Sequence, residues 1–364
     1  MLINRGGFDG FFLPVLIYLM TVMSVFVSLF NFSFLIYAII FSILGLVAYI
    51  KFLFLNYLSL FFIGIVTLFL FGSFSHLFLY DYDGLFKLSA ILNSILLGYI
   101  FSLVYERLPF SKIYYTLGIL IFLYILFFPD VGGGSIHVNR TYYTVPLAIV
   151  LLASAIQEYC SMGTIDVKKI LLYFFISTLS FSRAGLLLLP IFLLFYLPSV
   201  KGLYKKILLS LITISTIFLL IIIFPEVFEL IVNKKFAPTD SGRLFIWSYY
   251  IEQVKGVKEL FFGINMVQFN NDISYDIFNG NLGNTLHNSL LGAHSLLGMT
   301  SLIIFFIFFR LCVKVQKKNN FHSLYLFTLF LFTLKINTEA AILPQRFDYI
   351  FFAMLFYLYR YNRS

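Results

Sequence analysis

Apolar stretches about as long as a lipid bilayer is thick recur along most of this chain. Of its 364 residues, 61% are hydrophobic and 11% are charged, whereas a soluble domain has about a quarter charged residues. A helix needs about 20 apolar residues to cross a bilayer. The first such stretch, Phe11 to Phe30, is too long for the apolar part of a signal peptide, so we expect it to be retained. The sequence therefore predicts an all-α, polytopic integral membrane protein.

The apolar stretches predict about twelve transmembrane helices, given the length that one crossing needs. Their approximate ranges are 11–30, 33–50, 52–71, 85–104, 113–128, 142–159, 169–182, 184–198, 207–225, 287–309, 321–337 and 347–359. We expect a single transmembrane domain over residues 1–364, interrupted by one long polar loop at residues 226–286.

The distribution of Lys and Arg predicts the orientation of the chain, because short cytoplasmic loops are enriched in these residues. Placing the N-terminus inside brings most of the basic residues to the cytoplasmic side, with the C-terminus inside and the long loop outside. The formal net charge of +9 is then explained by basic helix ends rather than by a nucleic-acid partner. Cys160 and Cys312 fall at cytoplasmic ends, so neither a disulfide nor a metal site is expected.

The stretch from Lys169 to Ser199 has an arginine, Arg183, at its centre. As one helix it would run about 45 Å against a hydrocarbon core of about 30 Å, and an arginine at the midplane would cost about 2.5–3.5 kcal/mol. Two short helices that meet at Ser182-Arg183 avoid both problems. They would leave Arg183 in a recess below the outer surface.

The outer face is predicted to carry arginines in short loops at Arg140, Arg183 and Arg346, joined by Arg243 from the long loop. Each of them could be an interfacial side chain that reaches for water. Taken together, they run against the rule that short loops rich in Lys and Arg lie in the cytoplasm. The planar guanidinium group of arginine suits phosphate and carboxylate groups. We therefore predict an anion site, with Glu339 as an outer carboxylate that could orient a sugar.

Two further features lie in the long loop and at its exit. Residues 239–241, Thr-Asp-Ser, precede a stretch of helical periodicity, which puts Arg243 in the first turn of an external amphipathic helix. Backbone donors at that end favour an anion. His287-Asn288 opens the next transmembrane helix, and His294 follows seven residues later on the same face. His287 is a candidate general base at the water–membrane boundary, although a lone interfacial histidine is often structural.

These segments resemble the O-antigen polymerase and O-antigen ligase superfamily over about residues 180–300. The matching residues are Ser241-Gly242-Arg243-Leu-Phe-Ile-Trp247, Leu260-Phe-Phe-Gly263-Ile, His287-Asn288-Ser289-Leu290, Gly298 and Phe181-Ser182-Arg183-Ala184-Gly185. In that family an arginine opens the loop helix, a glycine turn follows, and a His-Asn pair starts the next helix. The family has Gly where this chain has Ala184.

The resemblance implies a metal-independent glycosyltransferase that needs no cofactor, in a bacterial inner (cytoplasmic) membrane, with its active site facing the periplasm. His287, Arg243 and Arg183 would be catalytic, and Arg140, Arg346, Asn288 and Glu339 would bind substrate. The substrate would be an undecaprenyl-diphosphate-linked oligosaccharide.

Three named functions stay open from the sequence, beside the more general alternatives of another membrane glycosyltransferase and a structural assembly protein. The first is an O-antigen polymerase that joins lipid-linked repeat units in lipopolysaccharide biosynthesis. The second is an O-antigen ligase that transfers glycan to the lipid A core, and the third, a non-enzyme, is a flippase for lipid-linked oligosaccharides. Beyond the lipid bilayer, a chain-length regulator is a candidate protein partner.

Overall fold

The computed structural model describes only part of the chain, and within that part every regular element is a helix. The described residues are 8–29, 43, 83–127, 141–162, 166–180, 202–223, 243–264, 269, 291, 294–295, 297–303, 306, 310 and 348–361. No strand occurs among them. The predicted all-α class is therefore confirmed for these residues.

The long helices lie where the apolar stretches predict them, within a few residues at each end. They are α1 (Phe8–Leu29), α4 (Asp83–Leu103), α5 (Phe110–Phe127), α6 (Thr141–Met162), α7 (Val167–Leu179), α9 (Leu203–Ile223) and α17 (Asp348–Tyr361). The predicted ranges 33–50, 52–71, 184–198 and 321–337 fall outside the described residues except at Ile43, and 287–309 is described in part. Among the described helices, two segments are long and apolar enough to cross a membrane: Phe110–Phe127 and Thr144–Met162.

Helix α7 ends earlier than the sequence suggests. Its last residue is Leu179, and the N–H of Ser180 still donates to the carbonyl of Ile176. The helix that contains Lys169 therefore ends at Leu179. This agrees with the prediction, made from the length of the stretch, that it is not one continuous helix. The helix ends three residues before Ser182, where we predicted the break.

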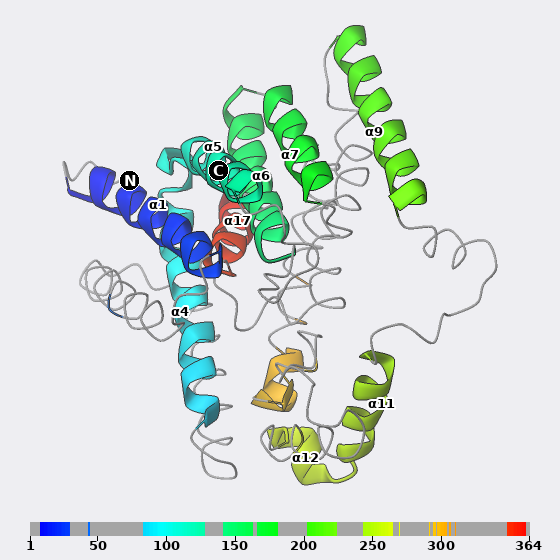
Figure 1. Ribbon diagram of the computed structural model, residues 1–364. Coiled ribbons are helices and arrows are strands. Elements are labelled where there is room, and N and C mark those ends of the chain that lie inside the picture. Colours follow the sequence, from blue (N-terminus) through cyan, green and yellow to red (C-terminus); the bar gives the residue numbers. More distant parts are fainter. Residues whose placement is uncertain are drawn as a thin grey trace.

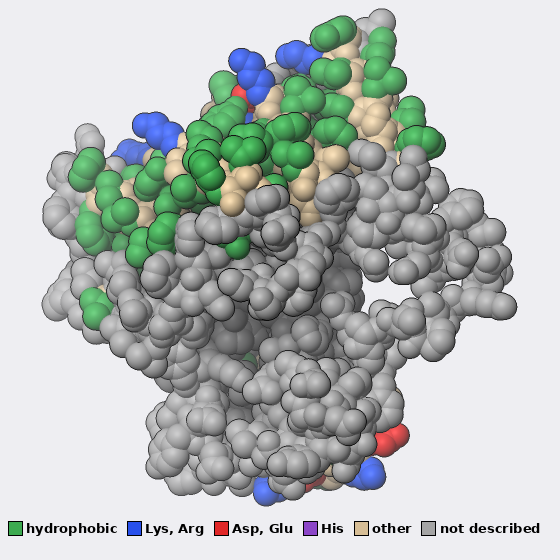
Figure 2. All heavy atoms as spheres, viewed as in Figure 1, with side chains coloured by type: hydrophobic (Ala, Val, Ile, Leu, Met, Phe, Trp, Pro, Cys, Tyr) green, Lys and Arg blue, Asp and Glu red, His purple; other side chains and the backbone are tan. Residues whose placement is uncertain are grey.

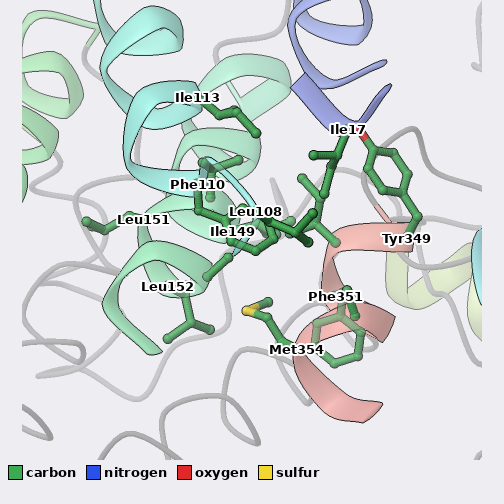
Figure 3. Close-up of a cluster of buried hydrophobic side chains, with 14 of the residues drawn as sticks. Ile17, Leu108, Phe110, Ile113, Ile149, Leu151, Leu152, Tyr349, Phe351 and Met354 are labelled. Carbon is green, nitrogen blue, oxygen red and sulfur yellow. The ribbon is translucent and has the colours of Figure 1, made fainter. Parts of the chain in front are cut away.

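The core lies where α1, α4, α5, α6 and α17 pack together (Figure 1). Figure 3 shows side chains from α1, α5, α6 and α17 converging, with Ile17 of α1 beside Tyr349 of α17. Polar bonds link the same helices. The hydroxyl of Thr21 donates to the carbonyl of Ile17 and lies 2.8 Å from the Tyr349 hydroxyl. Tyr18 of α1 and Thr116 of α5 are bonded at 2.9 Å.

Helices α4 and α17 approach each other closely at Gly98. A β-carbon there would lie 3.0 Å from the carbonyl of Tyr349 and 3.0 Å from the nitrogen of Ala353. Small residues at such crossings let two helix backbones pack tightly. Just beyond the end of α4, the ring of Tyr105 stacks on the ring of Tyr357 in α17, with centroids 4.3 Å apart. The backbone of α17 therefore packs directly against α4 at Gly98.

Large apolar side chains are exposed along the outer faces of several helices, and small hydroxyl side chains lie inside. The exposed residues recur every three or four positions: Phe11, Val15, Leu19, Met23 and Phe26 on α1; Leu171, Phe175 and Leu179 on α7; Ile207, Leu211, Ile214 and Phe218 on α9. The buried polar residues include Thr21 and Ser24 on α1 and Thr213 and Thr216 on α9, each bonded to the carbonyl four residues before it. Figure 2 shows hydrophobic side chains covering the upper part of the molecule, with Lys and Arg along its edge.

Candidate functional site

Of the seven predicted site residues, the structure describes the backbone of Arg243 and places it at the first position of α11 (Arg243–Gln253). The other predicted residues fall outside the described chain: His287, Arg183, Arg140, Arg346, Asn288 and Glu339. The helix start agrees with the prediction from the Thr-Asp-Ser sequence. The first backbone N–H groups of an α-helix have no partner within the helix and carry partial positive charge. The start of α11 is thus suited to an anion.

A second short helix, α12 (Val257–Phe262), follows α11 after a tight turn. The N–H of Val254 donates to the carbonyls of Tyr250 and Ile251, which closes α11. Gly263 ends α12 with φ of 88°. In Figure 1 the two helices lie at the end of the molecule away from α5, α6 and α7.

His294 ties both of these helices to the segment 294–303. Its Nδ1 atom lies 2.8 Å from the hydroxyl of Tyr250 in α11, and its Nε2 atom lies 2.9 Å from the carbonyl oxygen of Leu260 in α12. A carbonyl only accepts, so Nε2 carries a hydrogen and donates. In the neutral ring Nδ1 then accepts from Tyr250. His294 and Tyr250 are both buried, and their rings stand nearly perpendicular at 87°.

Two glycines bring α12 and this segment into backbone contact. A β-carbon at Gly263 would lie 2.6 Å from the carbonyl oxygen of His294. One at Gly298 would lie 2.7 Å from the Cα of Phe262 and closer still to the carbonyl of Phe261. Both glycines have positive φ, 88° and 55°, which other residues adopt at a cost of about 1–2 kcal/mol. We call this contact, with the His294–Tyr250 and His294–Leu260 bonds, the loop junction.

Apolar and aromatic side chains pack around the loop junction. Phe269 packs on Tyr250, with ring centroids 5.6 Å apart, and Ile264 and Leu297 are buried beside the glycines. The outer side of α12 carries exposed Lys258. The Tyr250–His294 bond is buried at this junction, and burial strengthens it because water competes less for its atoms.

A second polar cluster lies at the opposite end, between α6 and α7. The ammonium group of Lys169 is bonded to Glu158 and to Ser154, and it lies 5.7 Å from the ring centre of Tyr115. Tyr115 in turn donates to the carboxylate of Asp166 at 3.1 Å. Lys169 is only 1% exposed. The cluster holds α6, α7 and α5 together at the end that the sequence assigns to the cytoplasm.

The turn between α4 and α5 is fixed by side chains from other helices. The amide of Gln157 contacts the carbonyl oxygens of Tyr105, Glu106 and Leu108 at 2.8–3.0 Å. The hydroxyl of Tyr105 donates to the carbonyl of Ala153 at 2.9 Å, and burial raises the pKa of this hydroxyl well above its usual value. The bonds from Gln157 give side-chain partners to three carbonyl groups of the turn and so tie it to α6. We assign this end of the molecule a structural role.

Comparison with known proteins identifies no relative. No protein family, curated protein or solved structure matches this chain. Within the described residues, no three His, Cys, Asp or Glu side chains lie together in a way that could hold a metal ion.

Sequence reasoning missed Tyr250 and the structural role of His294. No signal in either local pattern indicates their bond, because the two residues are 44 apart in the sequence. Sequence reasoning also treated Lys169 as an ordinary basic residue at a helix end, whereas the structure buries it against Glu158.

Proposed function

We propose that this chain is an O-antigen polymerase of a bacterial inner membrane, which joins repeat units carried on undecaprenyl diphosphate. The observation that carries the proposal is the loop junction. The α11–α12 unit spans the family-like segment from Arg243 to Gly263, and it packs against the segment that contains Gly298. Three of the resembling motifs, those at Arg243–Trp247, Leu260–Ile264 and Gly298, thus belong to one structural unit.

The surface supports membrane insertion as part of the proposal. Exposed apolar stripes run along α1, α7 and α9, and buried serines and threonines lie on α1 and α9. A water-soluble protein rarely exposes such large contiguous apolar surface. Transmembrane helices, in contrast, face lipid with apolar side chains and use small and hydroxyl residues at their contacts. We propose about twelve such helices, with both termini in the cytoplasm.

The positions of charged ends support the proposed orientation. Exposed basic residues flank the α4–α5 turn, α7 and α9 at Arg107, Lys112, Lys168, Lys205 and Lys206. Arg107 lies in the turn between α4 and α5, and the four lysines lie within the first four residues of their helices. The inside rule for positive charge applies at such helix ends. With this side in the cytoplasm, the α11–α12 unit lies in the periplasm.

The proposed reaction is a direct transfer at the anomeric carbon of the growing chain. A hydroxyl oxygen of the incoming repeat bonds to that carbon, and the bond from the carbon to the diphosphate oxygen breaks. Undecaprenyl diphosphate leaves, and the acceptor proton passes to His287. Arg243 and Arg183, assisted by Arg140 and Arg346, stabilise the charge that develops on the departing diphosphate.

The test replaces each proposed catalytic arginine with lysine, which keeps the charge but loses the two-pronged geometry. We expect Arg243→Lys and Arg183→Lys to lower polymer formation about 10²–10³-fold, the usual effect of losing one such contact. Membrane levels of the protein should be unchanged. Arg107→Lys, at an exposed arginine of the opposite end, is the matched control and should retain wild-type activity. If both test variants form as much polymer as the wild-type protein, the proposal that these arginines bind the diphosphate is refuted.

Deleting the gene separates the three functions. A lipopolysaccharide core with a single repeat unit on a gel supports a polymerase. A bare core with lipid-linked polymer accumulating would mean a ligase instead. Single repeats confined to the cytoplasmic leaflet would mean a flippase.

A further inference from the structure

Helix α9 presents a continuous apolar face to the outside of the molecule, at whose edge it lies (Figure 1). Ile207, Leu211, Ile214 and Phe218 recur every three or four residues, and each is 51–63% exposed. The side of the helix that carries Leu209 is buried. From the first to the last of the exposed residues the helix rises about 17 Å, which is close to one leaflet of a hydrocarbon core about 30 Å thick. The exposed face therefore matches the acyl chains of a single leaflet.

Polar and charged side chains take over at the start of α9, where the apolar face ends. Tyr204 is 77% exposed, and Lys205 and Lys206 are exposed next to it in the sequence. The change from lysine to isoleucine at residue 207 puts two ammonium groups at the edge of the apolar face. Tyrosine and lysine side chains are typical of the headgroup level of a bilayer. One surface of α9 thus combines a region suited to headgroups with a region suited to acyl chains.

No ion pair within the described residues balances the positive charge at the start of α9. The helix contains no Asp or Glu, and neither Lys205 nor Lys206 forms a salt bridge in the described part of the chain. Helix α7 contacts α9 and begins after Asp166. The carboxylate of Asp166, however, accepts from the backbone N–H of Lys168 and from the hydroxyl of Tyr115. The charge of the two lysines is therefore available to an external anion.

We propose that the outer face of α9 and the two lysines at its start bind an anionic phospholipid of the cytoplasmic leaflet. The phosphate of the lipid lies against Lys205 and Lys206, and its acyl chains lie along the face from Ile207 to Phe218. One lipid molecule supplies both the negative charge and the apolar surface that this helix lacks. The inference rests on the proposed membrane insertion and orientation, and it does not depend on the polymerase reaction.

The test compares the full chain in nanodiscs of phosphatidylcholine with the full chain in nanodiscs of phosphatidylcholine and phosphatidylglycerol in equal parts. The readout is hydrogen exchange of the Lys206 amide, which donates to the carbonyl of Gly202 at 3.2 Å in the first turn of α9. A bound lipid stabilises this turn by mass action. A lysine near an anionic surface contributes about fivefold in affinity, so exchange should be about twenty-fivefold slower with phosphatidylglycerol.

Two pairs of substitutions show whether the effect belongs to α9. Lys205→Gln with Lys206→Gln removes both charges, and the ratio of exchange rates in the two lipids should fall below about twofold. Lys112→Gln with Lys168→Gln is the matched control, since it removes two exposed lysines from the starts of α5 and α7 at the same end of the molecule. This control should keep the wild-type ratio. If it lowers the ratio as much as the first pair does, the response reflects the total charge of that end, and the inference is overturned.

The remaining outcomes separate a lipid from a soluble anion, and this inference from the proposed function. Inorganic phosphate added to phosphatidylcholine nanodiscs should leave the exchange rate unchanged, and slowing equal to that with phosphatidylglycerol would overturn the lipid assignment. Equal exchange of the wild-type amide in the two lipids would refute the inference and leave the polymerase proposal standing. A chain that enters neither kind of nanodisc would refute the proposed membrane insertion, and the inference with it.

Discussion

Replacing Gly298 with alanine should separate α12 from the segment 294–303. Glycine tolerates the φ of 55° there, whereas alanine pays about 1–2 kcal/mol. The new β-carbon would lie 2.7 Å from the Cα of Phe262, and carbon atoms prefer about 3.5–4.0 Å. The two backbones must therefore move apart by about 1 Å. The His294–Leu260 bond, now 2.9 Å, would stretch beyond hydrogen-bonding distance.

The stability loss follows from these two effects. An unsatisfied buried donor costs about 1–3 kcal/mol, so with the backbone strain the total is about 2–5 kcal/mol. Gly202→Ala is the control, because Gly202 has φ of 101° and no atom within 4 Å of the position a β-carbon would take. That variant should show the backbone strain without the separation.

Hydrogen exchange of the Gly263 amide reports the separation directly. This N–H donates to the carbonyl of Glu259 at 2.9 Å and closes α12. A difference of about 2 kcal/mol between Gly298→Ala and the control corresponds to about thirtyfold faster exchange. Equal exchange rates at this amide in Gly298→Ala and Gly202→Ala would refute the close-contact argument.

Three further predictions concern other parts of the chain. Lys169→Met should destabilise the protein in detergent by about 3–5 kcal/mol, because it leaves Glu158 largely buried without its cation; adding Glu158→Leu should recover most of that loss, and no recovery would mean that the pair is not the cause. Gly98→Ala should be less stable than Gly118→Ala by about 2 kcal/mol or more, since the first meets backbone of α17 and the second only the tip of a leucine side chain; equal unfolding free energies would contradict this. Lys258→Cys, in a chain whose native cysteines are replaced by serine, should react with a membrane-impermeant maleimide added outside intact spheroplasts, and labelling only after the membrane is opened would reverse the proposed orientation.

The sequence predicted the described long helices well because their signal is local. An apolar run of sufficient length specifies a helix wherever it lies, and the start of α11 at Arg243 followed from three capping residues. Helix α7 was less well predicted, since its end at Leu179 has no glycine or proline to mark it. The range 169–182 was therefore too long at its C-terminal end.

The contacts between helices could not be predicted from one sequence. Tyr250 and His294 are 44 residues apart, and nothing in either local pattern indicates that they bond. Lys169 resembled an exposed terminal lysine because its partner Glu158 lies on a different helix. Such pairings depend on how helices pack, which local periodicity does not encode. The other predicted site residues lie outside the described part of the chain, so their arrangement remains a prediction.

The contact at Gly263 and Gly298 has a consequence for how this chain can change over generations. Main-chain atoms make the contact, so the spacing between α12 and its neighbour is independent of the side chains around them. A descendant that kept the two glycines could replace most neighbouring residues while the backbone contact of the loop junction stayed the same. In the proposed polymerase, a preference for a different sugar could then arise by substitutions around the junction without a change in that contact.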